Sequence, residues 1–383
     1  MTWQQGGPQA DGNPQGGYPQ GGYPQSGYPP AGHPQGGYIP PEAWNGAPAY
    51  PGMILPPPVE DPTPYHRLFR TARAYAWWRP LVAVAVFVAF FLVTQVVVAI
   101  GWVIVIIASG ANLTDFTSIP AVMGQLTDVS NPVSLVLLLG SVAIMLPLVP
   151  LAMLCAGLRP VSLRHSVAFR IRWRWMLWCT IPALVITILS TGLSFLGPLF
   201  GVPIEPVPVD AGRFTLLAVL IIALVPLQSA AEEYVFRGLV MQTIGAWVKN
   251  PWVGIIVSTV IFTVGHTQYE IWGLLSVGVM GLGFAIVVWR TGGLEAGIAF
   301  HVVNNVVALL LLASGSLGTT IMSSEGSDPL APLVQAVFTA GFVLWVELAA
   351  RRQGISRERP LPPAEVFTSP PPPASPLPPT HTV

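Results

Sequence analysis

The chain has 383 residues, of which 17 are Lys or Arg and 17 are Asp or Glu, so its formal net charge is zero. Charged residues make up 9% of the sequence and hydrophobic residues 52%, with a mean hydropathy of +0.61. A soluble globular protein has about 25% charged residues. These values exclude a soluble enzyme, a disordered chain and a nucleic-acid-binding protein, which would need a basic excess. They predict an all-α, polytopic membrane protein.

Both ends of the chain are rich in proline and glycine. From Gly16 onward a unit of the type Gly-Gly-Tyr-Pro-Gln recurs, and residues 370–373 are all proline. Such composition lowers helical propensity and leaves little apolar surface to bury, so residues 1–66 and 354–383 are predicted to be disordered tails. Each tail is interpreted as a solvated spacer, with binding of an unidentified partner as the alternative. The N-terminal residues are polar, so no cleavable signal peptide is expected.

Residues 67–353, between the tails, are the predicted transmembrane domain. Apolar runs long enough to cross a bilayer recur in it. The expected spans lie at about 81–107, 133–157, 175–199, 215–240, 252–268, 271–289, 294–314 and 331–350. The protein is therefore expected to cross the cell membrane about eight times.

Basic residues are concentrated in alternate connections between these spans. Fifteen of the 17 Lys and Arg residues precede the first span, separate the second from the third, or follow the fourth, sixth and eighth. Connections rich in Lys and Arg remain in the cytoplasm. The opposite connections carry acidic residues such as Asp115 and Glu205. Both termini are therefore predicted to be cytoplasmic.

The segment EEYVFRG places three ionisable residues, Glu232, Glu233 and Arg237, inside the fourth span. Charge at membrane depth is costly and is usually retained for function. Glu233 and Arg237 are four residues apart on one helical face, so they are expected to form an ion pair. Glu232 lies about 100° away around the helix, which leaves it available to accept a proton from water. The alternative is that both acids pair with Arg237 and only join helices.

Two further spans carry polar pairs with the same spacing. Phe262 precedes His266 by four residues, and His301 precedes Asn305 by four. Taken alone, each pair is also typical of packing or of a hydrogen bond between helices. Taken with Glu232, they supply a base, two imidazoles and an amide, which suits hydrolysis of a peptide bond inside a membrane. Signatures such as HExxH or the Walker lysine motif are absent from the sequence.

The segments EEYVFRG, FTVGH and HVVNN resemble the three motifs of the CPBP intramembrane proteases, also called the CAAX protease and bacteriocin-processing family. The resemblance covers about residues 215–312, the predicted catalytic core. It implies an eight-span helical endopeptidase that cleaves a peptide or a membrane protein. It also implies that Glu233 and Arg237 form an ion pair that supports the site.

The resemblance further implies a role for each remaining motif residue. Glu232 matches the catalytic glutamate and His266 the histidine that helps it to activate water, while His301 and Asn305 match the pair that stabilises the oxyanion. The family has been described as metalloproteases, although a metal-free glutamate mechanism is argued from its architecture. Zinc bound by His266, His301 and Glu232 is the alternative. Asn305 is a poor zinc ligand, so no cofactor is the preferred expectation.

The predicted depths of Glu232 and His266 disagree. Counting along the spans places Glu232 in the cytoplasmic half of the fourth span and His266 near the outer end of the fifth. Catalytic partners must come within hydrogen-bonding reach. Either the fifth helix is displaced or kinked near Pro251, or the limits of these two spans differ from those predicted.

Two other functions compete with peptidase activity. The same polar residues could line the pathway of a transporter or channel, although no internal repeat supports that interpretation. The chain could also be an inactive membrane scaffold whose tails recruit partners. The expected partners of the leading interpretation are the lipid bilayer and a peptide or membrane-protein substrate, and no nucleic acid is expected.

Overall fold

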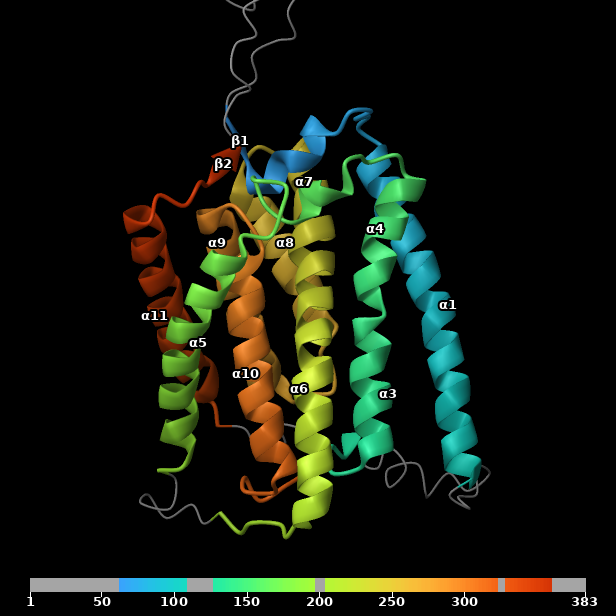
Figure 1. The fold of residues 1–383 in the computed structure, drawn as a ribbon, viewed down its shortest axis with the longest axis vertical. Coiled ribbons are helices and arrows are strands. Elements are labelled where there is room, and N and C mark those ends of the chain that lie inside the picture. Colours follow the sequence, from blue (N-terminus) through green and yellow to red (C-terminus); the bar gives the residue numbers. More distant parts are fainter. Residues whose placement is uncertain (1–61, 109–126, 197–203, 323–327, 360–383) are drawn as a thin grey trace, which may run out of the picture. The chain divides into compact units, whose positions relative to one another are not determined.

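The structure is a computed structural model that describes residues 62–108, 127–196, 204–322 and 328–359 (Figure 1). Within these ranges it is mostly helical, and seven helices are long and apolar enough to cross a membrane. A further apolar helix, α8 (Pro251–Val264), has 14 residues. The prediction of a polytopic helical membrane protein with about eight spans is confirmed. The predicted tails lie almost entirely outside the described residues.

The first three spans are α1 (Arg79–Ala108), the consecutive helices α3 (Pro132–Ala143) and α4 (Met145–Cys155), and α5 (Trp173–Ser194). The side chain of Asn131 accepts hydrogen bonds from the backbone at the start of α3, which caps the helix. Most apolar side chains of α1 are exposed, and in a membrane protein such a surface faces lipid.

The fourth span is longer than predicted and the fifth is shorter. Helix α6 (Ala211–Glu233), the π-helix η6 (Tyr234–Val240) and α7 (Met241–Trp247) follow one another without a break and form a 37-residue unit. The predicted limits of 215–240 for the fourth span and 252–268 for the fifth are therefore wrong. The backbone remains helical through α7, where polar residues such as Gln242 end the apolar run.

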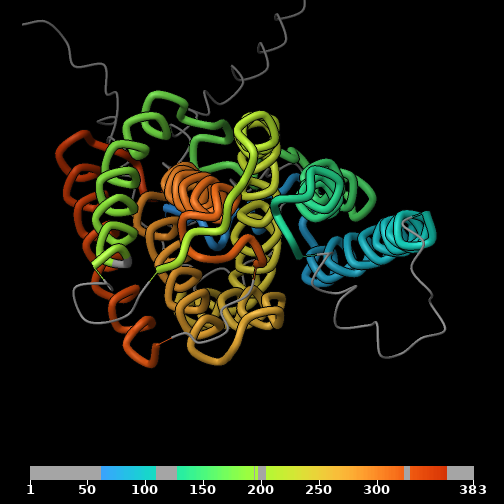
Figure 2. The backbone as a smooth tube through the Cα atoms, turned by 90° about the horizontal axis from the view of Figure 1, so that it is seen from below, coloured from blue at the N-terminus to red at the C-terminus, as the bar shows by residue number. Residues whose placement is uncertain are grey.

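The last three spans are α9 (Ile271–Thr291), α10 (Glu295–Ala313) and α11 (Ala331–Arg352). Helix α10 is central: it packs against α5, α6 and α9, whereas α11 packs on α5 and α9 (Figure 2). Helix α3 packs on α6, and α1 packs on α4. The residues of α10 thus face helices from both halves of the chain.

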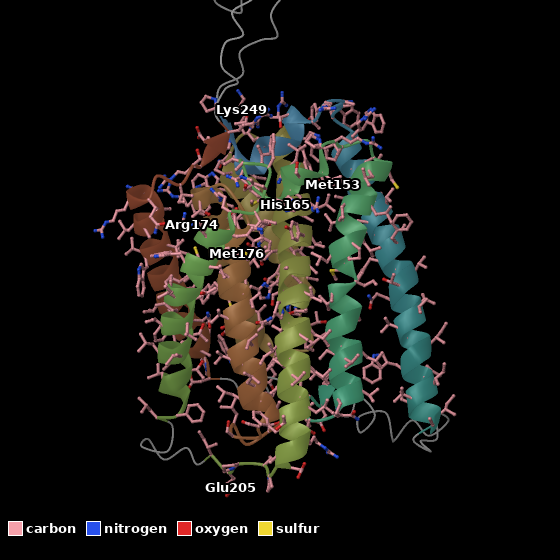
Figure 3. All side chains as sticks on the ribbon, viewed as in Figure 1. Met153, His165, Arg174, Met176, Glu205 and Lys249 are labelled. Atoms are coloured by element: carbon pink, nitrogen blue, oxygen red, sulfur yellow. The ribbon has the colours of Figure 1, made fainter. Side chains whose placement is uncertain are left out.

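Short elements cover one end of the bundle, which carries Lys249, His165 and Arg174, while Glu205 lies at the opposite end (Figure 3). We call the end with Lys249 the basic end. There β1 (Thr63–Pro64) pairs antiparallel with β2 (Glu358–Arg359), and the 3-10 helix η2 (Tyr65–Thr71) packs on α7. The short 3-10 helix η4 (Val161–Arg164) lies in the connection between α4 and α5. The described residues thus include a few from each predicted tail, 62–66 and 354–359.

Helix η2 is held on α7 by basic side chains. Arg67 and Arg70 each donate a hydrogen bond over 3.2 Å, to the carbonyl groups of Gly245 and Ala246. These carbonyls lie in the last turn of α7, where positive charge is favourable. A Cβ atom on Gly245 would lie 1.9 Å from the carbonyl oxygen of His66, so this approach requires glycine. We call these contacts, together with the β1–β2 pair, the clasp.

Candidate active site

Glu233 and Arg237 form an ion pair inside the bundle, as their spacing predicted. Arg237 Nη1 donates to Glu233 Oε1 over 2.9 Å, and both side chains are fully buried. The guanidinium also donates to the Gly281 carbonyl and lies 4.7 Å from the centre of the Phe262 ring. A Cβ on Gly281 would lie 2.7 Å from Phe262 Cδ1, so α9 can pack this closely only with glycine there. Such additional contacts offset the desolvation of a buried ion pair.

His301 on α10 lies between the two glutamates. Its Nδ1 is 3.1 Å from Glu233 Oε1, and its Nε2 is 3.3 Å from Glu232 Oε2. The Phe284 ring stacks on the imidazole with centroids 4.7 Å apart. Because a carboxylate oxygen only accepts hydrogen bonds, the hydrogen on Nδ1 is assigned to the contact with Glu233. His301 therefore connects the ion pair with Glu232.

Glu232 has a different environment from its neighbour. Its side chain is 8% exposed, and it forms no ion pair with an arginine among the described residues. Its Oε2 atom is buried without a hydrogen bond in that part of the chain, because the contact with His301 lies outside hydrogen-bonding geometry. A buried carboxylate oxygen without a hydrogen bond is unusual. Glu233 Oε2 is likewise buried without a hydrogen bond among the described residues. The two acids therefore differ in charge pairing and in access: Glu233 pairs with Arg237, whereas Glu232 lines a cavity.

The lengths of two neighbouring helices bring Glu232 and His266 to the same depth. Before the connection at residues 248–250, η6 and α7 together contain the 14 residues that follow Glu233. After this connection, α8 also has 14 residues. Both η6 and α7 pack against α8, so Glu233 and Val264 lie at matching heights. Pro251 starts α8 and does not kink it. The predicted depths of Glu232 and His266 therefore disagreed because the predicted limits of the fourth and fifth spans were wrong.

The chain leaves helical geometry where α8 ends. At 1.5 Å per residue α8 is about 21 Å long, less than the roughly 30 Å of hydrocarbon in a bilayer. Residues 265–270 then lead to α9 without forming a helix. Such backbone is tolerated at membrane depth where it lines a cavity. His266, Gln268 and Tyr269 of this segment do line one.

The imidazole of His266 is oriented by the end of α8. Its Nδ1 lies 2.7 Å from the carbonyl oxygen of Phe262, and its ring is 4.5 Å from the Phe262 ring and 6.3 Å from that of Tyr269. A carbonyl oxygen only accepts, so Nδ1 carries the hydrogen and Nε2 is the acceptor of the neutral ring. This tautomer can accept a proton from water.

A row of amides lies beside the glutamates. Asn304 Nδ2 donates to Asn305 Oδ1 over 3.2 Å, and Asn305 Nδ2 donates to Gln228 Oε1 over 3.3 Å. Ser229 Oγ donates to the same Gln228 oxygen over 3.1 Å. His301 and Asn305, which the resemblance pairs, therefore have different partners: His301 contacts the carboxylates, and Asn305 contacts Gln228.

Gln228 is a site residue that the sequence motifs did not indicate. It lies four residues before Glu232 on α6, a spacing that places both side chains on one helical face. The same spacing had been used to pair Glu233 with Arg237. Applied one turn earlier, it would have placed Gln228 beside Glu232.

These side chains line one cavity of about 330 Å³. The cavity is lined by residues of α3, α6, α8, α9, α10 and α11 and of the segment between α8 and α9. Its polar side includes Gln228, Glu232, His266, His301 and Asn305. Helix α3 contributes an apolar wall, formed by Leu138, Leu139 and Val142. A carboxylate and several neutral donors thus face an apolar wall across a space of small-molecule size.

The zinc alternative requires Glu232, His266 and His301 to converge on one ion. In the described part of the chain, no three His, Cys, Asp or Glu side chains are arranged to hold a metal ion. His301 instead contacts two carboxylates, and Nδ1 of His266 faces a backbone carbonyl. The donor set in this arrangement does not fit a zinc site, and we derive no step through a metal.

Comparison with known proteins finds a family model that is similar to the part of the chain that holds this site. Residues 214–307 match the family model named Type II CAAX prenyl endopeptidase Rce1-like. The resemblance to the CPBP proteases is confirmed over these residues. The matched region contains Glu232, Glu233, Arg237, His266, His301 and Asn305.

A curated relative and the solved structures add little about activity. The uncharacterized protein YyaK of Bacillus subtilis (strain 168) is 26% identical over 154 residues, which are 36% of this chain and 50% of the relative. This chain therefore spans about half the length of the relative that it matches. No solved structure matches the chain. The CPBP match covers one quarter of the sequence, yet the cavity also includes Leu138 and Gln335, which lie outside it.

Proposed function

We propose that the protein is an intramembrane endopeptidase that hydrolyses a peptide bond in a peptide or membrane protein. The main support is the placement of Glu232: its open Oε2 lies 3.3 Å from His301 Nε2, in the cavity that His266 also lines. The match to CAAX-type endopeptidases over the same residues supports the same class of reaction. The substrate is a peptide segment that reaches this cavity from the bilayer or its surface.

In the proposed reaction, Glu232 accepts a proton from water while the water oxygen attacks the carbonyl carbon of the scissile bond. The electron pair of the C=O bond moves to oxygen, and hydrogen-bond donors stabilise the resulting oxyanion. The C–N bond then breaks, and the proton held on Glu232 moves to the leaving nitrogen. His266 orients the water through Nε2. We assign His301 to positioning Glu232, because its Nε2 faces that carboxylate.

We also propose that the protein lies in the cell membrane with its basic end and both termini in the cytoplasm. Fifteen of the 17 basic residues lie in the connections assigned to that side, and such residues favour cytoplasmic connections. A protease added to sealed, right-side-out cells should leave tags on both termini intact. Cleavage of either tag would contradict this orientation.

The test compares peptide termini in membranes from cells that express the wild type, Glu232→Gln or Glu205→Gln. The matched control, Glu205, is an exposed carboxylate at the opposite end of the bundle from Lys249 (Figure 3). Mass spectrometry should find new termini with the wild type and with Glu205→Gln. Loss of a general base should lower their formation by about 100-fold or more in Glu232→Gln. Equal cleavage by Glu232→Gln at equal expression would reject the mechanism.

A metal-free mechanism makes a separate prediction for the purified protein. Cleavage should survive incubation with a zinc chelator, because the proposed base and donors are side chains of the chain itself. Loss of cleavage that returns on addition of zinc would favour the metal alternative. If no variant-dependent termini appear, ion-flux assays would test the transporter interpretation.

A further inference from the structure

We propose that Gln228 is a further catalytic residue, which donates a hydrogen bond from Nε2 to the oxygen of the scissile carbonyl and to the oxyanion formed from it. This inference rests on the proposed peptidase function and names a donor that the sequence motifs do not contain. No atom is transferred by Gln228. Its N–H group stabilises the negative charge that the carbonyl oxygen gains when water attacks.

The first support is the placement of the Gln228 side chain. The residue is 7% exposed and lines the cavity together with Glu232. Its Oε1 accepts hydrogen bonds from both Ser229 Oγ and Asn305 Nδ2. Its Nε2 has no partner among the residues that the structure describes. Because a side-chain amide is planar, two bonds to Oε1 fix the direction in which the free N–H groups point.

The second support is the order of donors and acceptors in the amide row. Asn304 donates to Asn305, and Asn305 donates to Gln228. With Asn305 oriented in this way, a reversed Gln228 amide would place its Nε2 against the Nδ2 of Asn305, with donor facing donor. In this orientation the row presents a donor at its cavity end. Hydrogen bonds arranged head to tail also polarise one another, which strengthens the last donor.

The third support is the position of Gln228 relative to the base. Residues four apart on a helix have Cβ atoms about 5–6 Å apart, so Gln228 lies one turn from Glu232. An oxyanion donor must lie about 3 Å from the developing oxyanion, on the far side of the reacting carbon from the attacking water. A separation of one helical turn leaves room for a carbonyl group between the two side chains.

Nearby donors have partners that Gln228 lacks. Arg237 donates to Glu233 and to the Gly281 carbonyl. Nδ1 of His301 faces Glu233. Asn305 gives one of its two amide hydrogens to Gln228. Gln228 is thus a cavity donor whose oxygen is held in place by two hydrogen bonds and whose own N–H groups have no partner among the described residues.

The first experiment measures cleavage of the peptide whose processing is lost in Glu232→Gln. Gln228→Met keeps the length of the side chain and removes the donor. It should lower kcat by about 100-fold or more, the usual effect of removing one oxyanion donor. The KM should change by less than about threefold, because the hydrogen bond strengthens in the transition state. The matched control, Gln95→Met, makes the same change on α1, where Gln95 Nε2 donates to the Ser141 carbonyl outside the cavity, and should retain kcat within about threefold.

The second experiment separates a direct contact from a structural role. The same peptide is prepared with a thioamide at the scissile bond, whose sulfur is a weak hydrogen-bond acceptor. The ratio of amide to thioamide kcat should be large for the wild type and for Gln95→Met, and should fall about tenfold or more in Gln228→Met. A structural defect would lower both rates equally. Thermal midpoints in detergent verify that each variant is folded.

The outcomes distinguish this inference from the proposed function. If Glu232→Gln abolishes cleavage but folded Gln228→Met retains kcat within about threefold of the wild type, or keeps the full amide-to-thioamide ratio, the role of Gln228 is rejected and the peptidase stands. If no peptide depends on Glu232, both fall together. Asn305→Asp adds a further check: its effect on kcat should largely disappear in the Gln228→Met background, because Asn305 acts through Gln228. Additive effects would instead assign the oxyanion contact to Asn305.

Discussion

Glu233 and Glu347 both contact arginine side chains, in different surroundings. Glu233 pairs with Arg237 inside the bundle, and both side chains are fully buried. Glu347 on α11 lies at the basic end with 14% of its side chain exposed, and it contacts three arginines. These are Arg290, Arg351 and Arg357. Because Glu347 has several cations and is partly exposed, no single arginine is essential to it.

Inside the bundle, Glu233 does not have several arginine partners. Among the described residues, one arginine balances Glu233, and His301 is shared with Glu232. A second carboxylate placed beside this pair, Glu232, is therefore left without a cation among the described residues, and it lines the cavity. The comparison shows how adjacent residues of one sequence acquire different chemistry. The charge of Glu233 is neutralised by structure, whereas Glu232 remains available for reaction.

Removal of Arg237 is expected to have the largest effect on stability. Arg237→Met leaves Glu233 buried without its cation, which should lower the free energy of unfolding by about 3–5 kcal/mol. Arg351→Met, at the basic end, should cost no more than about 1 kcal/mol, because the Arg351 side chain is 58% exposed and Glu347 keeps Arg290 and Arg357. Thermal midpoints and folded yield in detergent provide the measurement.

The double variant Glu233→Met/Arg237→Met tests whether the unpaired carboxylate causes this loss of stability. Removing both charges should recover much of the stability lost in Arg237→Met, because the cost comes from the uncompensated carboxylate. If Arg237→Met and Arg351→Met destabilise the protein equally, the distinction between the two regions is wrong.

A smaller effect is expected where α9 packs on the interior pair. Gly281→Ala places a methyl group 2.7 Å from Phe262, so the ring under the guanidinium must move. The expected loss is about 1–3 kcal/mol, the usual cost of overpacking. Gly140→Ala in α3 is the matched control, since nothing lies within 4 Å of its added methyl group. Equal thermal midpoints for both variants would show that the packing of α9 tolerates the methyl group.

The smallest effect concerns pH at the basic end. His165 lies in the connection between α4 and α5, and burial together with nearby Arg164 lowers its pKa to about 4. The unfolded chain binds this proton near pH 6.5. Stability should therefore decrease as the pH falls from about 6.5 to 4, and this contribution should change little below pH 4.

His165→Gln, compared with the wild type from pH 7 to 4, isolates this contribution. The variant should show a shallower decrease of the thermal midpoint over that range. Some dependence should remain, because burial also lowers the pKa of His66. An unchanged slope in His165→Gln would exclude His165 as its source.

Spacing along a helix predicted the contacts that one helix makes with itself. The i to i+4 rule placed Arg237 on Glu233, and that pair is present. Apolar runs located most spans, because burial in lipid requires a continuous apolar segment. What the apolar runs could not show was that the helix continues through α7 beyond its apolar part, or that α8 stops after 14 residues. Those two lengths determine the depth of His266.

Contacts between different helices were predicted less well. His301 faces two carboxylates, and Asn305 faces Gln228, because α10 packs against α6. A motif names the residues that meet but not the atoms that face one another. The clasp was also missed, since a stretch with several arginines before the first span is typical of any cytoplasmic flank.

The clasp has a consequence for the order of events during synthesis. Arg67 contacts a carbonyl that lies 178 residues later in the chain. At about 5–20 residues per second, a ribosome needs roughly 10–40 s to make that distance. Helix η2 is therefore synthesised well before its partner α7, and four spans are made before the two can dock. Its docking on α7, followed by the pairing of β1 with β2, is among the last steps of assembly, so early release of the chain would leave this end open.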